Sequence, residues 1–167
     1  MNLPARPVLL VTALVLGCAH GGGKGLIEPD TIQAGQPGGT LTVRVSGVDP
    51  RSGTVRVGLF DKEDGFPTEE GLLVGRRVPA SQAVEDVVEV AFPATPQGRY
   101  ALSVYLDMND NEQLDEGSFG IPTEPYGFSR GAMGHFGPPE FEDAAFNHGF
   151  EEQLVPLHLG GIRLTPR

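Results

Sequence analysis

The sequence has 167 residues, enough for a single domain, and contains 24 Gly, 15 Pro and no Trp. This composition favours short strands joined by many turns over an architecture of long helices. The formal net charge of -10 would repel the phosphates of a nucleic acid, so nucleic acid is excluded as an expected partner.

The N-terminal segment has the features of a secretory signal peptide. Arg6 precedes an apolar run over residues 8–16 that is too short to span a bilayer as a helix. The run leads into Val15-Leu16-Gly17-Cys18, which resembles the lipobox cleaved by the lipoprotein signal peptidase. Cys18 is the only cysteine and cannot form an internal disulfide, so we expect it to carry the lipid anchor. The alternative is a buried cysteine within an uncleaved anchor.

The residues after Cys18 indicate the address and the domain boundary. Ala19 stands where an Asp would indicate retention at the inner membrane, which favours the outer membrane. The expected organisation is a signal peptide over residues 1–17, a lipidated cysteine and flexible tether over residues 18–39, and a domain over residues 40–167. We therefore expect a cell-envelope lipoprotein that contacts the membrane through its lipid, with the domain in the periplasm or on the cell surface.

Two strands are predicted at the start of the domain. Residues 41–46 and residues 54–59 each alternate apolar with polar or small side chains, which is the pattern of a half-buried strand. A turn signal at residues 49–53 separates them, so we expect the two strands to form a hairpin.

Three further strands are predicted along the chain. Residues 88–92 and residues 100–106 are separated by a short turn-rich segment, and we expect these two strands to pair with each other. A last strand over residues 155–164 contains Pro156, which indicates an edge strand. The alternation of the second of these strands predicts one buried face, made of Tyr100, Leu102, Val104 and Leu106.

Five strands in this order predict an all-β fold, a single antiparallel β-sandwich with the Greek-key topology of immunoglobulin or transthyretin domains. Residues 107–149 lack a strand pattern but are rich in aromatic side chains. We expect them to form a long ordered loop cap with at most one short helix, near residues 140–146. The aromatics would fill the open end of the sandwich, and a ligand pocket in the cap is the alternative. These aromatics are Phe119, Tyr126, Phe128, Phe136, Phe141 and Phe146.

An Asx-rich segment at the start of the cap is a candidate cation site. Oxygen-bearing side chains occupy its first, third, fifth and ninth places, namely Asp107, Asn109, Asn111 and Asp115. This spacing resembles the first part of an EF-hand or dockerin loop and predicts a Ca²⁺ site. The sixth and twelfth places depart from a complete EF-hand, so a further ligand would come from Glu116, Glu142 or Asp143. The alternative is an Asx turn that satisfies its own backbone without a metal.

Several motifs in order resemble one bacterial family. They are Val57-Gly58-Leu59-Phe60-Asp61, Gly65-Phe66-Pro67, Gly98-Arg99-Tyr100-Ala101, Asp107-Met108-Asn109-Asp110-Asn111, Phe119-Gly120-Ile121-Pro122, Tyr126-Gly127-Phe128-Ser129, Phe136-Gly137-Pro138-Pro139 and Phe141-Glu142-Asp143-Ala144-Ala145-Phe146. Together they span about residues 40–165, and the chain resembles the domain of unknown function 2141 family. The resemblance implies an exported β-sandwich without an assigned activity, and it brings no catalytic residues.

Two functions from different classes are consistent with these residues. The first is a non-enzymatic envelope module that presents its cap to an unknown protein or glycan, with Ca²⁺ ordering the cap. The second is a periplasmic hydrolase that uses an unrecognised carboxylate site, with Asp107 paired to Glu142 or Asp143. A serine nucleophile is not favoured, because Ser129 near His135 lacks the Gly-x-Ser-x-Gly elbow.

Overall fold

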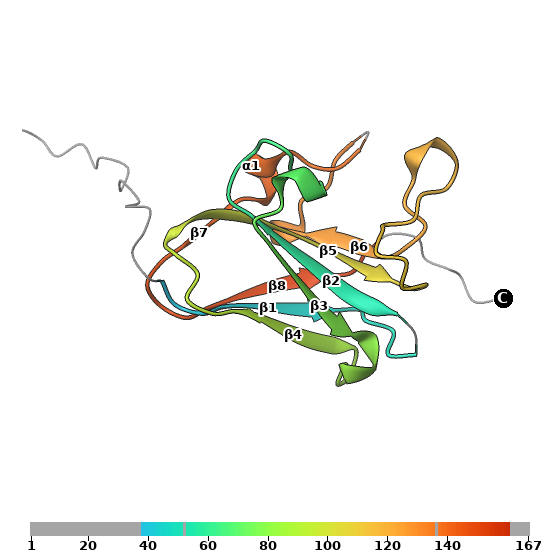
Figure 1. The fold of residues 1–167 in the computed structure, drawn as a ribbon, viewed down its shortest axis with the longest axis horizontal. Coiled ribbons are helices and arrows are strands. Elements are labelled where there is room, and N and C mark those ends of the chain that lie inside the picture. The colour runs from blue at the N-terminus through green and yellow to red at the C-terminus, as the bar shows by residue number, and fades with distance from the viewer. Residues whose placement is uncertain (1–37, 52, 136, 161–167) are drawn as a thin grey trace, which may run out of the picture. The chain divides into compact units, whose positions relative to one another are not determined.

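The computed structural model describes residues 38–51, 53–135 and 137–160, which form two facing β-sheets (Figure 1). The first sheet has the strand order β4-β1-β8, and the second has the order β3-β2-β5-β6 with β7 also paired to β5. The predicted signal peptide, Cys18 and nearly all of the tether lie outside the described residues. The strands are β1 (Leu41–Ser46), β2 (Thr54–Phe60), β3 (Val74–Pro79), β4 (Val87–Phe92), β5 (Gly98–Asp107), β6 (Tyr126–Phe128), β7 (Phe146–His148) and β8 (Gln153–His158).

The predicted all-β sandwich is confirmed, and the pairing is antiparallel except between β1 and β8. That parallel ladder runs from Leu41 opposite Gln153 to Ser46 opposite His158. β8 is an edge strand, as Pro156 indicates, and this place suits a residue that has no N–H to donate. In the part of the chain that the structure describes, no helix is long and apolar enough to cross a membrane.

Both predicted hairpins are wrong. β1 pairs with β4 and β8, whereas β2 pairs with β3 and β5, so the chain crosses to the other sheet after β1. It returns to the first sheet between β3 and β4 and crosses once more between β4 and β5, which were also expected to pair. Alternation fixes which face of a strand is buried, but it does not distinguish a hairpin from an arch between two sheets.

The core between the two sheets has the predicted face of β5 at its centre. Tyr100, Leu102, Val104 and Leu106 are each at most 4% exposed, which confirms the predicted inward face. Their cross-sheet neighbours include Val43, Val90 and other apolar residues of the first sheet. Removal of this much apolar surface from water is the main favourable contribution to folding.

A second apolar cluster lies on the outer face of the second sheet. Ala101 and Phe60 alternate with inward-facing neighbours, so they point away from the main core and toward the cap. The Phe66 ring packs edge to face against Phe60, Phe128 and Phe141, at centroid distances of 5.0, 5.9 and 5.7 Å. Such aromatic pairs add stability beyond the area that they bury.

The cap is ordered over its described residues, but its packing differs from the prediction. Its helix α1 (Phe141–Ala144) lies where one short helix was expected, whereas β6 and β7 were not predicted. Phe128 and Phe141 cover the outer face of the second sheet instead of filling the open end of the sandwich. Phe146 packs against the main core. Three-residue strands are too short to leave a periodic pattern in a sequence.

Candidate functional site

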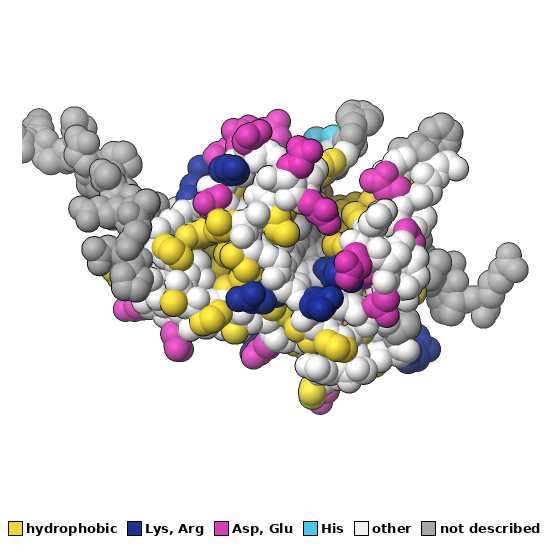
Figure 2. Space-filling view, viewed as in Figure 1, with side chains coloured by type: hydrophobic (Ala, Val, Ile, Leu, Met, Phe, Trp, Pro, Cys, Tyr) yellow, Lys and Arg dark blue, Asp and Glu magenta, His cyan; other side chains and the backbone are white. Residues whose placement is uncertain are grey.

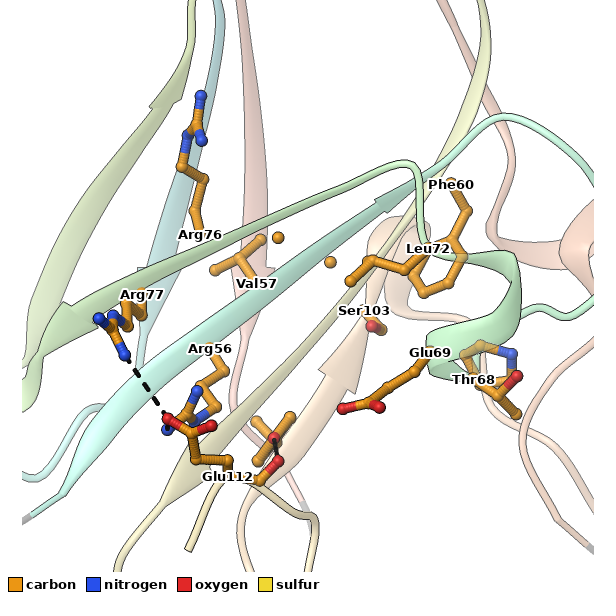
Figure 3. Close-up of a pocket in the computed structure, with 14 residues that line it drawn as sticks. Arg56, Val57, Phe60, Thr68, Glu69, Leu72, Arg76, Arg77, Ser103 and Glu112 are labelled. Atoms are coloured by element: carbon orange, nitrogen blue, oxygen red, sulfur yellow. Dashed lines mark hydrogen bonds and ion pairs between the residues drawn. The ribbon is translucent and has the colours of Figure 1, made fainter. Parts of the chain in front are cut away.

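The part of the second sheet that the aromatic cluster leaves uncovered forms a groove of about 330 Å³ (Figure 3). Its floor consists of β2, β3 and β5, where small residues face outward, namely Gly58, Gly75 and Ser103. Figure 2 shows basic side chains gathered on this face of the molecule, with acidic side chains beside them. This volume lies at the lower end of the range found for small-molecule sites.

The segment before β3 supplies one wall of the groove. The short 3₁₀ helix at Glu69–Gly71 and its flanking residues place Thr68, Glu69 and Leu72 along this wall. Phe60 closes the end of the groove next to the aromatic cluster (Figure 3). Gly58 permits this close approach, because a Cβ there would lie 2.9 Å from both Leu72 Cδ1 and Phe60 Cε2. The absence of a side chain at Gly58 thus allows Leu72 and Phe60 to pack against the backbone of the sheet.

Two arginines form the opposite end of the groove. Arg56 on β2 and Arg77 on β3 are register partners, so their side chains leave the same face of the sheet. A single carboxylate oxygen, Glu112 Oε1, lies 3.2 Å from Arg56 Nη2 and 3.5 Å from Arg77 Nη1 (Figure 3). Arg77 and Glu112 are 72% and 65% exposed, which leaves both within reach of solvent.

The buried carboxylate of Asp107 fixes the position of the Arg56 side chain. This carboxylate is fully buried at the end of β5 and accepts a 2.7 Å hydrogen bond from Arg56 Nε. It also accepts hydrogen bonds from the backbone N–H groups of Glu112 and Asn111, at 2.9 and 3.1 Å. Burial alone would raise the pKa of Asp107, but the Arg56 and backbone hydrogen bonds outweigh it and lower that pKa. Asp107 is therefore a structural anion at neutral pH.

Tyr105 joins the cap to the groove. Its hydroxyl donates a 3.0 Å hydrogen bond to the backbone carbonyl of Glu112 and so holds that residue beside the arginines. Burial raises the pKa of Tyr105 to about 12, with a further contribution from the negative charges of Asp107, Glu124 and Glu69. The hydroxyl consequently keeps its proton, and its role as a donor, at physiological pH.

The four predicted calcium ligands lie in one loop and are hydrogen-bonded to one another. Asp115 accepts hydrogen bonds from the side-chain amides of Asn109 and Asn111, at 2.7 and 2.8 Å. The oxygens of Asn109 and Asn111 accept from backbone N–H groups two residues further on, at 3.1 and 2.9 Å. This is the geometry of the Asx turn that the sequence offered as the alternative. Asp107 takes part through its bond from the Asn111 N–H.

Calcium binding stays a prediction. Among the described residues, no three His, Cys, Asp or Glu side chains are grouped in a way that would hold a metal ion. The proposed extra ligand Glu142 is paired instead with Arg99, at 2.5 Å. Arg99 and Asp107 are at opposite ends of β5, about 26 Å apart at the usual rise of a strand. Glu142 is therefore remote from the Asx-rich loop.

The same distance bears on the carboxylate pair suggested for a hydrolase. Asp107 and Glu142 are not brought together, and Asp143 belongs to the same short helix as Glu142. Ser129 is buried, and its Oγ donates to the Ala144 carbonyl at 2.6 Å and accepts from the Leu102 N–H at 2.9 Å. These bonds tie the cap to β5 and leave the hydroxyl committed to a structural role.

The groove was not identified from the sequence. Its residues come from β2, β3, β5, the wall at residues 67–72 and the cap, and strand β3 itself was not predicted. One local signal was present, since Arg76-Arg77 is a pair of basic residues in a strongly acidic chain. Arg76 also borders the groove, while its guanidinium lies 5.6 Å from the centre of the Phe92 ring.

The fold and this groove define an all-β sandwich domain with a partly charged surface groove. A family model described as an uncharacterized protein conserved in bacteria (DUF2141) matches residues 43–155, and the chain belongs to this family. The comparison with curated proteins found no match, and neither did the comparison with solved structures. Family membership agrees with the resemblance that the ordered motifs carried.

Proposed function

We propose that this protein is a non-enzymatic binding module of the bacterial cell envelope, with the groove on the second sheet as its ligand site. The observation that carries the proposal is an open groove that contains the apolar side chains of Leu72 and Phe60 and ends at two arginines on adjacent strands. A concave surface with a few convergent polar groups is the usual form of a small-molecule site. The position differs from the cap that the sequence favoured, although Glu112 of the cap borders the groove.

The chemistry of the groove residues supports binding over catalysis. Arg56 is held by Asp107, and the Tyr105 hydroxyl is held by a backbone carbonyl, so both are fixed in position. Ser103 also borders the groove, but no histidine is among the described residues that line the groove. A serine needs a general base within hydrogen-bond distance to act as a nucleophile.

The envelope address is part of the same proposal. The signal-peptide pattern over residues 1–17 and the lone Cys18 support an anchor at the membrane, with the outer membrane favoured. In this arrangement the 18–39 segment tethers the domain to its lipid, and the groove receives a ligand from the surrounding envelope. Ca²⁺ held by Asp107, Asn109, Asn111 and Asp115 would order the loop that carries Glu112.

The anchor is tested with Cys18→Ala expressed in a bacterial host that processes lipoproteins. Wild type is expected in the detergent phase after phase separation, with an acylated N-terminal cysteine in the mass spectrum. Cys18→Ala should move to the aqueous phase, whereas a matched His20→Ala control should not. Retention of Cys18→Ala in the detergent phase at the wild-type level would contradict lipidation.

The groove is tested by NMR on residues 18–167 carrying Cys18→Ala, which keeps both sheets and every groove residue. Three probes share one chain length and differ in charge: hexanoate, hexylamine and hexanol. At least one is expected to shift the amide signals of Gly58, Gly75 and Ser103 in a saturable way, and Gly75→Val should abolish the shift by filling the floor. If none of the three shifts these signals at millimolar concentration, the groove is not a small-molecule site.

A further inference from the structure

The two arginines are held in different ways, and the difference suggests which contact a ligand replaces. Arg56 has a buried partner in Asp107, at 2.7 Å, that does not depend on the groove. Glu112 approaches from the solvent side at longer distances, 3.2 Å to Arg56 and 3.5 Å to Arg77. Among the described residues, Arg77 has no other carboxylate partner. Glu112 is therefore the exchangeable member of the cluster.

The exposure of Glu112 adds a second reason to regard its contact as weak. The carboxylate is mostly exposed, and exposed ion pairs contribute little to stability because water competes for both charges. A carboxylate from outside that also gains apolar contact would compete favourably with it.

The groove supplies that apolar contact beside the arginines. Its floor runs from the arginines past Gly75 to Leu72, whose side chain covers Gly58. Leu72 is 38% exposed, so a ligand lying there would remove apolar surface of Leu72 from water. The site thus offers two guanidinium groups at one end and the partly exposed apolar side chain of Leu72 farther along the groove.

Glu69 limits the charge that the groove accepts. Figure 3 shows its side chain extending from the 3₁₀ helix toward the arginine end of the groove. The negative charge of Glu69 opposes a carboxylate placed at the arginines, and it opposes a ligand with two or more negative charges more strongly. The chain's overall charge of -10 acts in the same direction.

We infer that the groove binds a monocarboxylate with a short apolar body, whose carboxylate displaces Glu112 from Arg56 and Arg77 while the body lies over Gly75, against the exposed side of Leu72. This rests on the proposed function of the groove and specifies its ligand class. Glu112 acts as an internal occupant that keeps the arginines paired when the groove is empty. No covalent step is involved.

The inference is tested with the same protein and probes, with inorganic phosphate as a polyanion without an apolar body. Hexanoate is expected to bind more tightly than hexylamine, hexanol or phosphate, judged by titration of the Gly58 and Gly75 amide signals. Arg77→Ala should weaken hexanoate binding about fivefold, the effect of one exposed ion pair. Arg51→Ala, which removes an exposed arginine outside the groove, should leave binding unchanged.

Two further variants test the role of the acidic side chains. Glu112→Gln should strengthen hexanoate binding, because the internal competitor is gone. Glu69→Gln should strengthen phosphate binding more than hexanoate binding, whereas the neighbouring Glu70→Gln should change neither. Unchanged denaturation curves would establish that each variant is folded before its affinity is compared.

The outcomes separate this inference from the proposed function. If hexanol or hexylamine binds the groove as tightly as hexanoate, the groove is a ligand site but the carboxylate assignment is overturned. The assignment also fails if Arg77→Ala leaves hexanoate affinity at the wild-type level, or if phosphate binds more tightly than hexanoate. If no probe shifts the groove signals, both proposals fail together.

Discussion

The outer face of the second sheet is buried at one end and open to solvent at the other. At one end of β2 and β5, Phe60 and Ala101 are covered by the rings of Phe66, Phe128 and Phe141. At the other end, the same strands present Arg56 and Tyr105 beside the groove. The outward-facing side chains and the reach of the neighbouring loops therefore decide which part of the sheet face is buried. One part belongs to an apolar cluster, and the other forms the groove.

The largest difference between the ends should appear in stability. Phe60 is 1% exposed and contacts the Phe66 ring, so Phe60→Ala leaves a cavity that rigid neighbours fill only in part. The expected loss is about 3 to 5 kcal/mol of unfolding free energy. Leu72→Ala at the groove, where the side chain is partly exposed, should cost less than about 1 kcal/mol. Urea denaturation measures both, and equal losses would show that the two ends are packed alike.

The charged end should show its own, pH-dependent stability. Because the pKa of folded Asp107 lies below its ordinary value of 3.8, its ionised form contributes stability that is fully present above that pH. This contribution is lost as the pH falls below 3.8 and through the lowered pKa. Asp107→Asn leaves the exposed Glu112 as the only carboxylate partner of Arg56 among the described residues. The substitution should therefore lower the unfolding free energy by about 2 to 3 kcal/mol at pH 7.

The measurement is the difference in unfolding free energy between wild type and Asp107→Asn across the acid range. That difference should be constant from pH 7 to about pH 4 and should shrink below it. Asp110→Asn, in the same loop and exposed, serves as the matched control, and its difference from wild type at pH 7 should be small. A gap between wild type and Asp107→Asn that persists unchanged to the lowest pH would contradict a role for the Asp107 charge.

Features of these two ends could be predicted from the sequence only where they depend on residues close together in the chain. Alternation placed Leu102 and Leu106 in the core correctly, because side-chain direction on a strand follows from the strand itself. It misassigned the partners of β1 and β2, because pairing depends on where distant strands lie. The groove depends on Gly58, Arg77 and a wall from residues 67–72, which meet only in the folded sheet. The Asx turn was foreseen as one of two alternatives, since its hydrogen bonds span only a few residues.

Calcium would sharpen the contrast by ordering the loop at the charged end alone. If Asp107, Asn109, Asn111 and Asp115 bind Ca²⁺, calcium at a hundred times its Kd should stabilise the wild type by about 2.7 kcal/mol. Calorimetric titration and melting with and without chelator measure this. Asn109→Ala is the informative variant, because it removes a ligand and keeps the Arg56 pair intact. Absence of both heat and a melting shift at millimolar calcium would leave the loop as an Asx turn.

The smallest effect on stability is expected from filling the groove itself. A Cβ at Gly75 would find Leu72 Cδ2 as its only neighbour, at 3.4 Å, which is ordinary contact. The exposed leucine can move aside, and valine suits a strand better than glycine does, so Gly75→Val should change the unfolding free energy by less than about 0.5 kcal/mol. Gly58→Val should behave differently, because its Cβ would lie 2.9 Å from both Leu72 and Phe60, and the overpacking should cost about 1 to 3 kcal/mol. Chemical denaturation of the two variants side by side decides the point. Equal and large losses would mean that the floor under Gly75 is packed like the aromatic end, and that the groove is not open space.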